Sequence, residues 1–417
     1  MRIVLPVARP GLISAGLLAF LMAWDEFFYA LIFTSSPASK TVPVALAEFT
    51  GRYSLDFGQM AACWRRCRRC SSPCSSKSTS PAVSPRAQSS KEGSPMSRIS
   101  MSEGLRQQPD ALAAAIATLT EQLADPSAWP AARRPLFVAM GASHAALAAC
   151  VHRLRAAGIW AARAGCGPVG DADLVVGVSQ SGRSAETVAM LREAPPERRL
   201  AVVNVAPSPL AELAGRVLSC GSVADSKVST SGFSVTLAAL GMLGDVWADG
   251  RPDPVWRTLP GLLAVDLPPV VERVAECVAV DVVGGGASLT AAEEGALLLR
   301  EACRLPATAA ETRQYLHGPM ESAGPRTAHV IIGDEREAEL AAQLAGAGHL
   351  ALYVGPCESD VPRVAVPRIP PVARAIVENA VLQRLVAAVA EVRGVPVGEF
   401  RFSVGDTKVD SAAAEAV

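Results

Sequence analysis

The chain has 417 residues, of which half are hydrophobic and 19% are charged, and its 39 basic side chains balance its 40 acidic ones. A chain of this length has room for two or three domains with a sizeable core. The near-neutral charge gives no field that attracts nucleic acid or an anionic membrane surface, so we expect no nucleic-acid partner. Six of the ten cysteines stand singly in apolar segments, which predicts a reducing, cytoplasmic location.

Residues 1–62 are apolar and rich in aromatic side chains. The stretch 11–34 is long enough to cross a bilayer, but it contains Asp25 and Glu26, which favours packing inside a larger membrane protein over an isolated lipid-facing helix. A signal peptide fits badly because its apolar core is shorter and uncharged. The runs LPVARPGL and AWDEFFYALIFTSSPASKTVPVALAEFTGRYSLDFGQMAA resemble the late part of the permease subunit of carbohydrate ABC importers. The resemblance implies an apolar helical fragment, and any membrane contact would be confined to it.

Residues 63–100 are rich in Arg, Ser, Pro and Cys. Four of the cysteines are Cys63, Cys67, Cys70 and Cys74. One interpretation is a disordered basic linker. A second is a zinc site, although zinc ligands are usually two close pairs separated by a longer loop. We favour a third interpretation, a shifted reading frame: back-translated with GC-rich codons and read one nucleotide earlier, the segment becomes approximately LLAALPALLFALLFQKY, the last helix of a permease.

On that interpretation the native product begins near Met96 or Met101 and lacks residues 1–95. The intact mass of the untagged protein from its source cell would test this expectation.

From residue 101 onward, apolar strands alternate with helical segments, which is typical of βαβ units and a parallel sheet covered on both faces. A proline-rich joint at 252–269 separates two such runs, so we expect domains at 101–251 and 252–417. The expected strands are 136–140, 173–178, 200–205, 278–283, 330–332 and 350–354. The expected helices are 110–123, 145–156, one that ends near Leu191, and 290–303, with a turn at 141–144.

The loop 179–184 (SQSGRS) carries the clearest chemical signal. A Ser/Gly loop between a buried strand and a helix presents hydroxyls, backbone N–H groups and the positive helix end to one point, which suits a phosphate. The turn at 141–144 belongs at the same edge of the sheet. Taken alone, however, a serine at a helix start is more often an ordinary N-cap than a ligand site.

Five motifs occur in the order of a known family: residues 141–143 (GAS), 179–187 (SQSGRSAET), 229–233 (STSGF), 294–301 (EGALLLRE) and 317–319 (HGP). This order resembles the sugar isomerase (SIS) family, in particular the double-SIS isomerase half of glucosamine-6-phosphate synthase and the amino-sugar-phosphate deaminases and isomerases. The resemblance implies two tandem doubly wound parallel-sheet domains, each with three α-β-α layers. It also implies a sugar-phosphate substrate, no cofactor and a homodimer.

The resemblance implies roles for individual residues. Phosphate and nearby hydroxyls would be bound by Ser143, Ser179, Gln180, Ser181, Ser184 and Thr230. Glu301 would move a proton between the first two sugar carbons, and burial would raise its pKa toward that of a general base. His317 would assist ring opening across a dimer interface. Lys408 is the candidate for a Schiff-base lysine, although it could equally be a frayed surface residue. The five histidines show no metal-site spacing, so no metal is expected.

The chain also departs from the family pattern. Leu298 replaces a lysine of the synthase, and 333–335 (GDE) replaces the serine loop in the second domain, so we expect one phosphate site per chain. Residue 2 is arginine, which provides no amidotransferase nucleophile. Free ammonia is then the expected nitrogen species if the reaction releases nitrogen.

Three function classes stay open. The first is an enzyme acting on an amino-sugar or ketosamine phosphate by isomerisation, with or without loss of ammonia; an alternative to it is a member of the isomerising glutamine-fructose-6-phosphate transaminase group. The second is a non-catalytic sugar-phosphate sensor, which would not need Glu301 or His317; the lack of a helix-turn-helix pattern counts against it. The third is a membrane-anchored protein, and the missing last helix counts against that.

Overall fold

The computed structural model describes residues 50–51, 54–55, 98–129, 131–402 and 404–411. The chain divides into two compact units, Met1–Ser90 and Lys91–Val417. In the first unit, β1 (Thr50–Gly51) pairs antiparallel with β2 (Ser54–Leu55). The expected permease-like helix and the four clustered cysteines lie outside the described residues.

The first sheet of the second unit has five parallel strands in the order β5-β4-β6-β7-β8. In that order the strands are Ala162–Ala164, Pro135–Val138, Leu174–Ser179, Arg199–Val203 and Arg216–Ser219. The three central strands match the expected apolar runs, because strands buried on both faces are continuously hydrophobic. The two edge strands were not expected from the sequence, since they are short and only partly buried.

The second sheet repeats this topology with the order β11-β10-β12-β13-β14, again all parallel. In that order the strands are Ala307–Ala310, Ala279–Gly284, Thr327–Ile332, Leu350–Gly355 and Arg363–Ala365. In both sheets the strand that comes first in the chain lies second in the order, which is the doubly wound arrangement. The expected α/β class with two doubly wound parallel sheets is confirmed.

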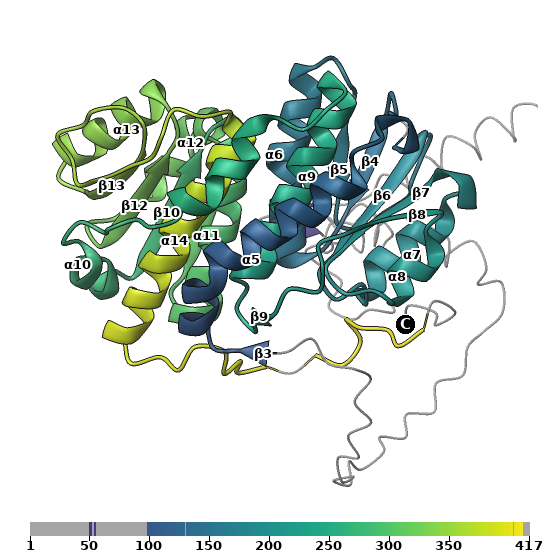
Figure 1. The fold of residues 1–417 in the computed structure, drawn as a ribbon. Helices are drawn as coiled ribbons and strands as arrows, with labels where there is room; N and C mark the ends of the chain where they lie inside the picture. Colours follow the sequence, from purple (N-terminus) through teal and green to yellow (C-terminus); the bar gives the residue numbers. More distant parts are fainter. Residues whose placement is uncertain (1–49, 52–53, 56–97, 130, 403, 412–417) are drawn as a thin grey trace, which may run out of the picture. The chain divides into compact units, whose positions relative to one another are not determined.

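Helices cover both faces of the two sheets. Five of them pack against one another between the sheets (Figure 1): α5 (Met101–Gln122), α6 (Gly141–Ala156), α9 (Ser231–Asp249), α11 (Leu289–Cys303) and α14 (Pro371–Val392). The remaining helices are α7 (Ala185–Glu193), α8 (Pro209–Leu213), α10 (Val271–Glu276), α12 (Thr312–Leu316) and α13 (Glu335–Gly346). Helix α6 begins at Gly141, so the expectation of a separate turn at 141–144 was wrong: these residues form the first helical turn.

The main hydrophobic core lies among the five central helices and the inner faces of both sheets. A smaller cluster lies under α7 and α8 and another under α12 and α13, which gives each sheet three layers. Among the described residues, α9 is the one helix long and apolar enough to cross a bilayer, and 94% of its apolar window is buried inside the protein. This burial is what a core helix requires.

Buried hydrogen bonds fix the central helices to one another. The Thr290 hydroxyl at the start of α11 donates to the Ala145 carbonyl of α6 (3.0 Å) and accepts from the Ala149 amide (2.8 Å). On α14, the Gln383 side chain accepts a 2.6 Å hydrogen bond from Gln108 of α5 and donates to the carbonyl of Thr230 (3.1 Å). These bonds set α11, which carries Glu301, relative to the first sheet.

Candidate functional site

The order of the first sheet identifies its ligand edge. Between β4 and β6 the chain reverses the direction in which it adds strands, and ligands of doubly wound sheets bind at that point, beyond the carboxyl ends of the strands. Two segments meet there. One is the first turn of α6, with half-buried Ser143, and the other is the serine loop, residues 179–184, between β6 and α7.

The serine loop does not use its hydroxyls as an ordinary helix cap. Ser184 is the N-cap residue of α7, yet its side chain makes no capping hydrogen bond. Its Oγ lies instead 3.1 Å from the Oγ of buried Ser179 at the end of β6. The Ser181 hydroxyl accepts from the Arg183 amide (3.3 Å). Hydroxyls therefore cluster at a helix start whose positive end favours an anion.

Gly182 gives the loop its shape. Its φ of +64° is a left-handed conformation, and a Cβ at this position would lie 2.0 Å from the Ser208 Oγ. Both the backbone conformation and the close approach to Ser208 therefore require glycine. A backbone carbonyl also fixes the loop: the Gln180 carbonyl accepts hydrogen bonds from the Asn204 and Val205 amides.

Gln180 connects the loop to the start of α9. Its Nε2 donates to the Ser229 hydroxyl (2.9 Å), which in turn donates to Asp225 Oδ2 (2.8 Å). The Thr230 hydroxyl donates to Asp225 Oδ1 (2.7 Å) and is fully buried. Thr230 therefore supports Asp225, while Ser229, which the sequence did not single out, is the residue that contacts Gln180.

The C-terminal tail, residues 399–402 and 404–411, docks on the serine loop. The Ala185 amide donates to the Thr407 carbonyl (3.1 Å) and the Val409 amide to the Arg183 carbonyl (2.9 Å). Val409 is buried in the cluster under α7, and Arg183 forms an ion pair with Asp410. Lys408 lies between these contacts.

The amine of Lys408 reaches the loop. Ser184 and Lys408 form an antiparallel bridge, and the Lys408 Nζ donates to the Ser184 Oγ at 3.3 Å. The structure thus brings Ser179, Ser184 and Lys408 together.

Glu301 lies near the end of α11 and lines a cavity of about 470 Å³. The same tail covers this cavity, which is also lined by Arg300, Arg304, Phe400 and Phe402. Burial raises the pKa of Glu301 to about 7, close to the value that suits a general base at neutral pH. The serine loop does not line this cavity, so the tail is the element that touches both places.

Glu294 lies two turns before Glu301 on α11 and is fully buried. Neither of its carboxyl oxygens has a hydrogen-bond partner among the described residues. Burial raises its pKa well above the ordinary value, and the nearby Glu301 and Asp225 raise it further. Leu298, at the position of the lysine found in the synthase, is also fully buried and offers no charge to Glu294.

His317 does not join the serine loop within the chain. It ends α12 beside the second sheet and is exposed. None of the hydrogen bonds described for the chain connects its ring to the loop or to Glu301.

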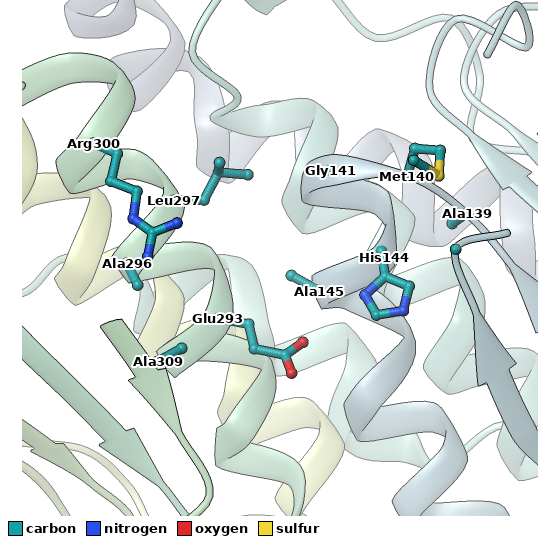
Figure 2. Close-up of a pocket in the computed structure, with 11 residues that line it drawn as sticks. Ala139, Met140, Gly141, His144, Ala145, Glu293, Ala296, Leu297, Arg300 and Ala309 are labelled. Carbon is teal, nitrogen blue, oxygen red and sulfur yellow. The ribbon is translucent and has the colours of Figure 1, made fainter. Parts of the chain in front are cut away.

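A second cavity, of about 420 Å³, lies between the start of α6 and α11. Figure 2 shows the Glu293 carboxylate on the side of this cavity that faces His144. Arg163 donates to both oxygens of that carboxylate through its two terminal guanidinium nitrogens. Burial lowers the pKa of His144, and Arg163 lowers it further. Arg300 lines this cavity as well as the one that contains Glu301.

The corresponding edge of the second sheet is unsuited to phosphate. A Cβ at Gly285 or at Gly333 would lie 2.7 Å from a carboxylate oxygen of Glu337, which occupies the space between the two loops. Asp334 adds a second carboxylate and pairs with Arg374 (2.7 Å). The Arg374 guanidinium compensates the charge of Asp334, but the Glu337 carboxylate still occupies the space between the two loops, which supports the prediction of one phosphate site per chain. Among the described residues, no group of three or more His, Cys, Asp or Glu could hold a metal ion.

No family model matches the chain. Among solved structures, the C-terminal domain of glucosamine-fructose-6-phosphate aminotransferase from Francisella tularensis is similar over 75% of this chain and 100% of its own, with a TM-score of 0.64 and 19% identity. The described part of the chain after residue 97 therefore has the double-SIS fold. Glucosamine-6-phosphate deaminase from Thermotoga maritima is similar over 71% of this chain and 95% of its own (TM-score 0.57, 17% identity).

A third double-SIS structure, tagatose-6-phosphate ketose/aldose isomerase from Escherichia coli, is similar over 72% of this chain and 97% of its own (TM-score 0.57, 16% identity). The expected resemblance to the SIS family is therefore confirmed at the level of the fold.

The N-terminal segment matches a different class of protein. It is 41% identical over 61 residues to the sulfoquinovosyl glycerol transport system permease protein SmoH of Agrobacterium fabrum. It is 44% identical over 50 residues to the trehalose transport system permease protein SugB of Mycobacterium tuberculosis. The chain spans about a fifth of the length of these permeases, 21% and 18% respectively. The expected resemblance to a permease fragment is confirmed.

Proposed function

We propose that the double-SIS region binds a sugar phosphate at the serine loop and isomerises an amino-sugar or ketosamine phosphate, with or without release of ammonia. One observation carries this proposal: at the ligand edge of the first sheet, Ser184 occupies the N-cap of α7 without capping it, and its hydroxyl joins that of Ser179. The Thr407 carbonyl accepts from the Ala185 amide at this helix start, and the clustered hydroxyls together with the positive end of the helix suit a phosphate group.

The serines anchor the substrate at its phosphate end. Ser179, Ser181 and Ser184 offer hydroxyl donors, and Ser143 lies in the first turn of the neighbouring helix α6 at the same edge. Gln180 is held by Ser229 and offers its amide to a sugar hydroxyl. An anchored phosphate fixes the orientation of the sugar carbons, which is the positioning that a proton transfer needs.

Glu301 is the proposed base. Isomerisation removes a proton from one sugar carbon and returns it to the neighbouring carbon, so one carboxylate serves both steps. A second proton moves from the hydroxyl or amino group on the first carbon to the carbonyl oxygen on the second. Where that group is an amine the product is an imine, and water hydrolyses the imine to a ketone and ammonia. With a pKa of about 7, Glu301 is substantially ionised at neutral pH and is still basic enough to take a proton. No cofactor is needed for this exchange.

The amine is part of the proposal because two of the structural relatives are named for reactions that involve an amino group, glucosamine-fructose-6-phosphate aminotransferase and glucosamine-6-phosphate deaminase. The third relative is named for ketose/aldose isomerisation without an amine. All three share this fold, and loss of ammonia therefore distinguishes the two reaction types for this chain.

Glu301→Gln tests the chemistry. The variant keeps the shape of the side chain and loses its basicity, so sugar-phosphate binding should persist while turnover falls at least 100-fold, the usual scale for a lost general base. The assay is a panel of hexosamine, ketosamine and hexose phosphates scored for ammonia, for the isomer formed, and for solvent deuterium at the second sugar carbon. Glu272→Gln, which changes an exposed glutamate of α10, is the matched control.

Full turnover and full deuterium exchange in Glu301→Gln would contradict the role of Glu301. If the parent protein binds a sugar phosphate but turns over none of the panel, the non-catalytic sensor becomes the better description.

His317 belongs to a second part of the proposal, a homodimer in which one copy provides the histidine for ring opening in the other. Its exposure at the end of α12 is compatible with contact to a second copy. His317→Ala should impair cyclic substrates more than open-chain ones. Mixing it with Glu301→Gln after partial denaturation should restore part of the activity if the site is shared; no restoration would contradict a shared site.

A further inference from the structure

A phosphate at the serine loop is stabilised by a nearby positive charge, and there are two candidates, Arg183 in the loop itself and Lys408 in the docked tail. Arg183 is already occupied: its guanidinium pairs with Asp410 and its Nε donates to the Val409 carbonyl (3.2 Å). Lys408 is different, since Ser184 Oγ is the one hydrogen-bond partner described for its Nζ. An ammonium group has three N–H donors, so at least two remain for a ligand.

The backbone holds Lys408 in this place. Hydrogen bonds flank it on both sides, from the Ala185 amide to the Thr407 carbonyl and from the Val409 amide to the Arg183 carbonyl. The side chain of Val409 is 8% exposed. Lys408 is therefore anchored within a docked strand-like segment, and this anchoring argues against a frayed surface lysine.

The location of Nζ also distinguishes two roles for a lysine in this tail. Forming a Schiff base requires the amine to lie at the sugar carbonyl, next to the group that moves the proton. Glu301, however, shares its cavity with an earlier part of the tail, Glu399 to Phe402. Lys408 lies at Ser184, at the phosphate end of the proposed site. The carbonyl and the phosphate are opposite ends of a hexose phosphate.

We propose that Lys408 is a phosphate-binding residue, held by the docked tail as the positive charge of the serine loop, and that it forms no Schiff base. This inference rests on the proposed sugar-phosphate site but not on turnover, so it applies equally to an enzyme and to a sensor. It predicts that the site prefers phosphorylated sugars over neutral ones.

The charges around the amine agree with this role. Partial desolvation lowers the pKa of Lys408 and the Arg183 guanidinium lowers it further, whereas Glu186 raises it. An incoming phosphate would offset both the desolvation and the repulsion from Arg183, so the ammonium favours an anionic ligand.

The test uses two probes that cannot form a Schiff base, inorganic phosphate and glucitol 6-phosphate, which has no carbonyl. In calorimetry with the full chain, Lys408→Met should weaken glucitol 6-phosphate binding at least tenfold, as expected for loss of a charged hydrogen bond. Lys408→Arg should bind within about threefold of the parent because it keeps the charge. Lys227→Met is the matched control, since Lys227 and Lys408 are the two lysines between residues 98 and 411.

A chemical trap provides the second readout. Borohydride reduction in the presence of fructose 6-phosphate, followed by intact mass and peptide mapping, should give no adduct at Lys408. An adduct there overturns the inference, as does unchanged binding in Lys408→Met when Ser181→Ala binds weakly, which would leave the serine loop as a phosphate site without Lys408. A parent protein that binds neither probe overturns both this inference and the proposed function.

Discussion

The α-carbon of Gly182 faces the hydroxyl of Ser208 so closely that a Cβ would lie 2.0 Å from the Ser208 oxygen. Two separate demands therefore meet at one glycine of the serine loop. The first is the positive φ of +64°, which costs a residue with a Cβ about 1 kcal/mol or more. The second is the lack of space: a Cβ at this position would also lie 2.4 Å from the Ser208 Cβ, and no side-chain rotamer moves either Cβ.

A matched pair of variants separates these demands. Gly158 has a φ of +80° with nothing within 4 Å of a Cβ, so Gly158→Ala should cost only the backbone term, about 1 kcal/mol in denaturant unfolding. Gly182→Ala should cost clearly more and should also abolish phosphate binding, because the loop must move. Equal unfolding costs with intact phosphate binding would show that Ser208 does not shape the loop.

Ser181→Ala should weaken sugar-phosphate binding without unfolding the protein. The substitution removes a donor to a charged acceptor, a loss of roughly 1.5 to 3 kcal/mol and thus roughly 10- to 100-fold in affinity. Calorimetry with glucitol 6-phosphate measures it, and Ser322→Ala, at an exposed position of the second domain, is the control. Unchanged affinity in Ser181→Ala would mean that its hydroxyl serves the Arg183 amide and not the ligand.

The central strands and the serine loop were predictable from the sequence because both depend on local pattern. Strands β6 and β10 are buried along nearly their full length, and parallel strands buried on both faces have continuous apolar sequences. The loop follows β6 directly, so the end of the strand places it at the ligand edge. The edge strand β5 has no such run, because every one of its residues is partly exposed.

The remaining part of the site depends on contacts between distant segments. Lys408 and Ser184 are 224 positions apart, and no local pattern indicates that a tail lysine pairs with a helix start. Ser229 was missed for a related reason: its role comes from the 2.9 Å contact with Gln180, 49 positions away. The sequence analysis chose Thr230 from this motif and not Ser229, and only the tertiary structure shows that Asp225 holds the Thr230 hydroxyl in the interior.

Because the Glu294 carboxyl is buried, we predict that the free energy of unfolding falls as the pH rises. Its carboxyl is fully buried without a hydrogen-bond partner, and its pKa in the folded state is raised well above 4.5. Above pH 4.5 the unfolded chain releases this proton more readily than the folded one, so the free energy of unfolding falls as pH rises toward the folded pKa. Glu294→Gln cannot ionise and should gain stability relative to the parent between pH 5 and pH 9.

Thermal unfolding of both proteins across that range measures the difference, with the exposed Glu272→Gln as the control. A constant difference in melting temperature between Glu294→Gln and the parent would show that Glu294 is already ionised and paired in the folded protein. Glu378, whose pKa burial raises to about 7, contributes the same trend to both proteins and cancels in the comparison.

The buried ring of His329 leads us to predict the opposite trend at acid pH, where the free energy of unfolding should fall as the pH falls. Its ring is 1% exposed in the second domain, where its Nδ1 lies 3.2 Å from the Tyr315 hydroxyl and its ring centroid 5.1 Å from that of His349. Burial, together with a smaller effect of the neighbouring His349, lowers the pKa of His329 to about 4. Between pH 6.5 and pH 4 the His329 ring is therefore protonated in the unfolded chain but mostly neutral in the folded protein, so the free energy of unfolding falls as the pH falls.

The difference between the unfolded value of 6.5 and the folded value of about 4 corresponds to a loss of about 3 kcal/mol once the pH is below 4. His329→Asn removes the titrating ring while its amide can still donate to the Tyr315 oxygen, whose own proton goes to Asp281 (2.7 Å). The variant should lose some packing at pH 8, but the slope of its unfolding free energy between pH 6.5 and pH 4 should be shallower than that of the parent.

Denaturant titrations at five pH values measure both slopes, with the exposed His152→Asn as control. Parallel slopes in His329→Asn and the parent would show that the buried ring accepts its proton as readily in the folded protein as in the unfolded chain.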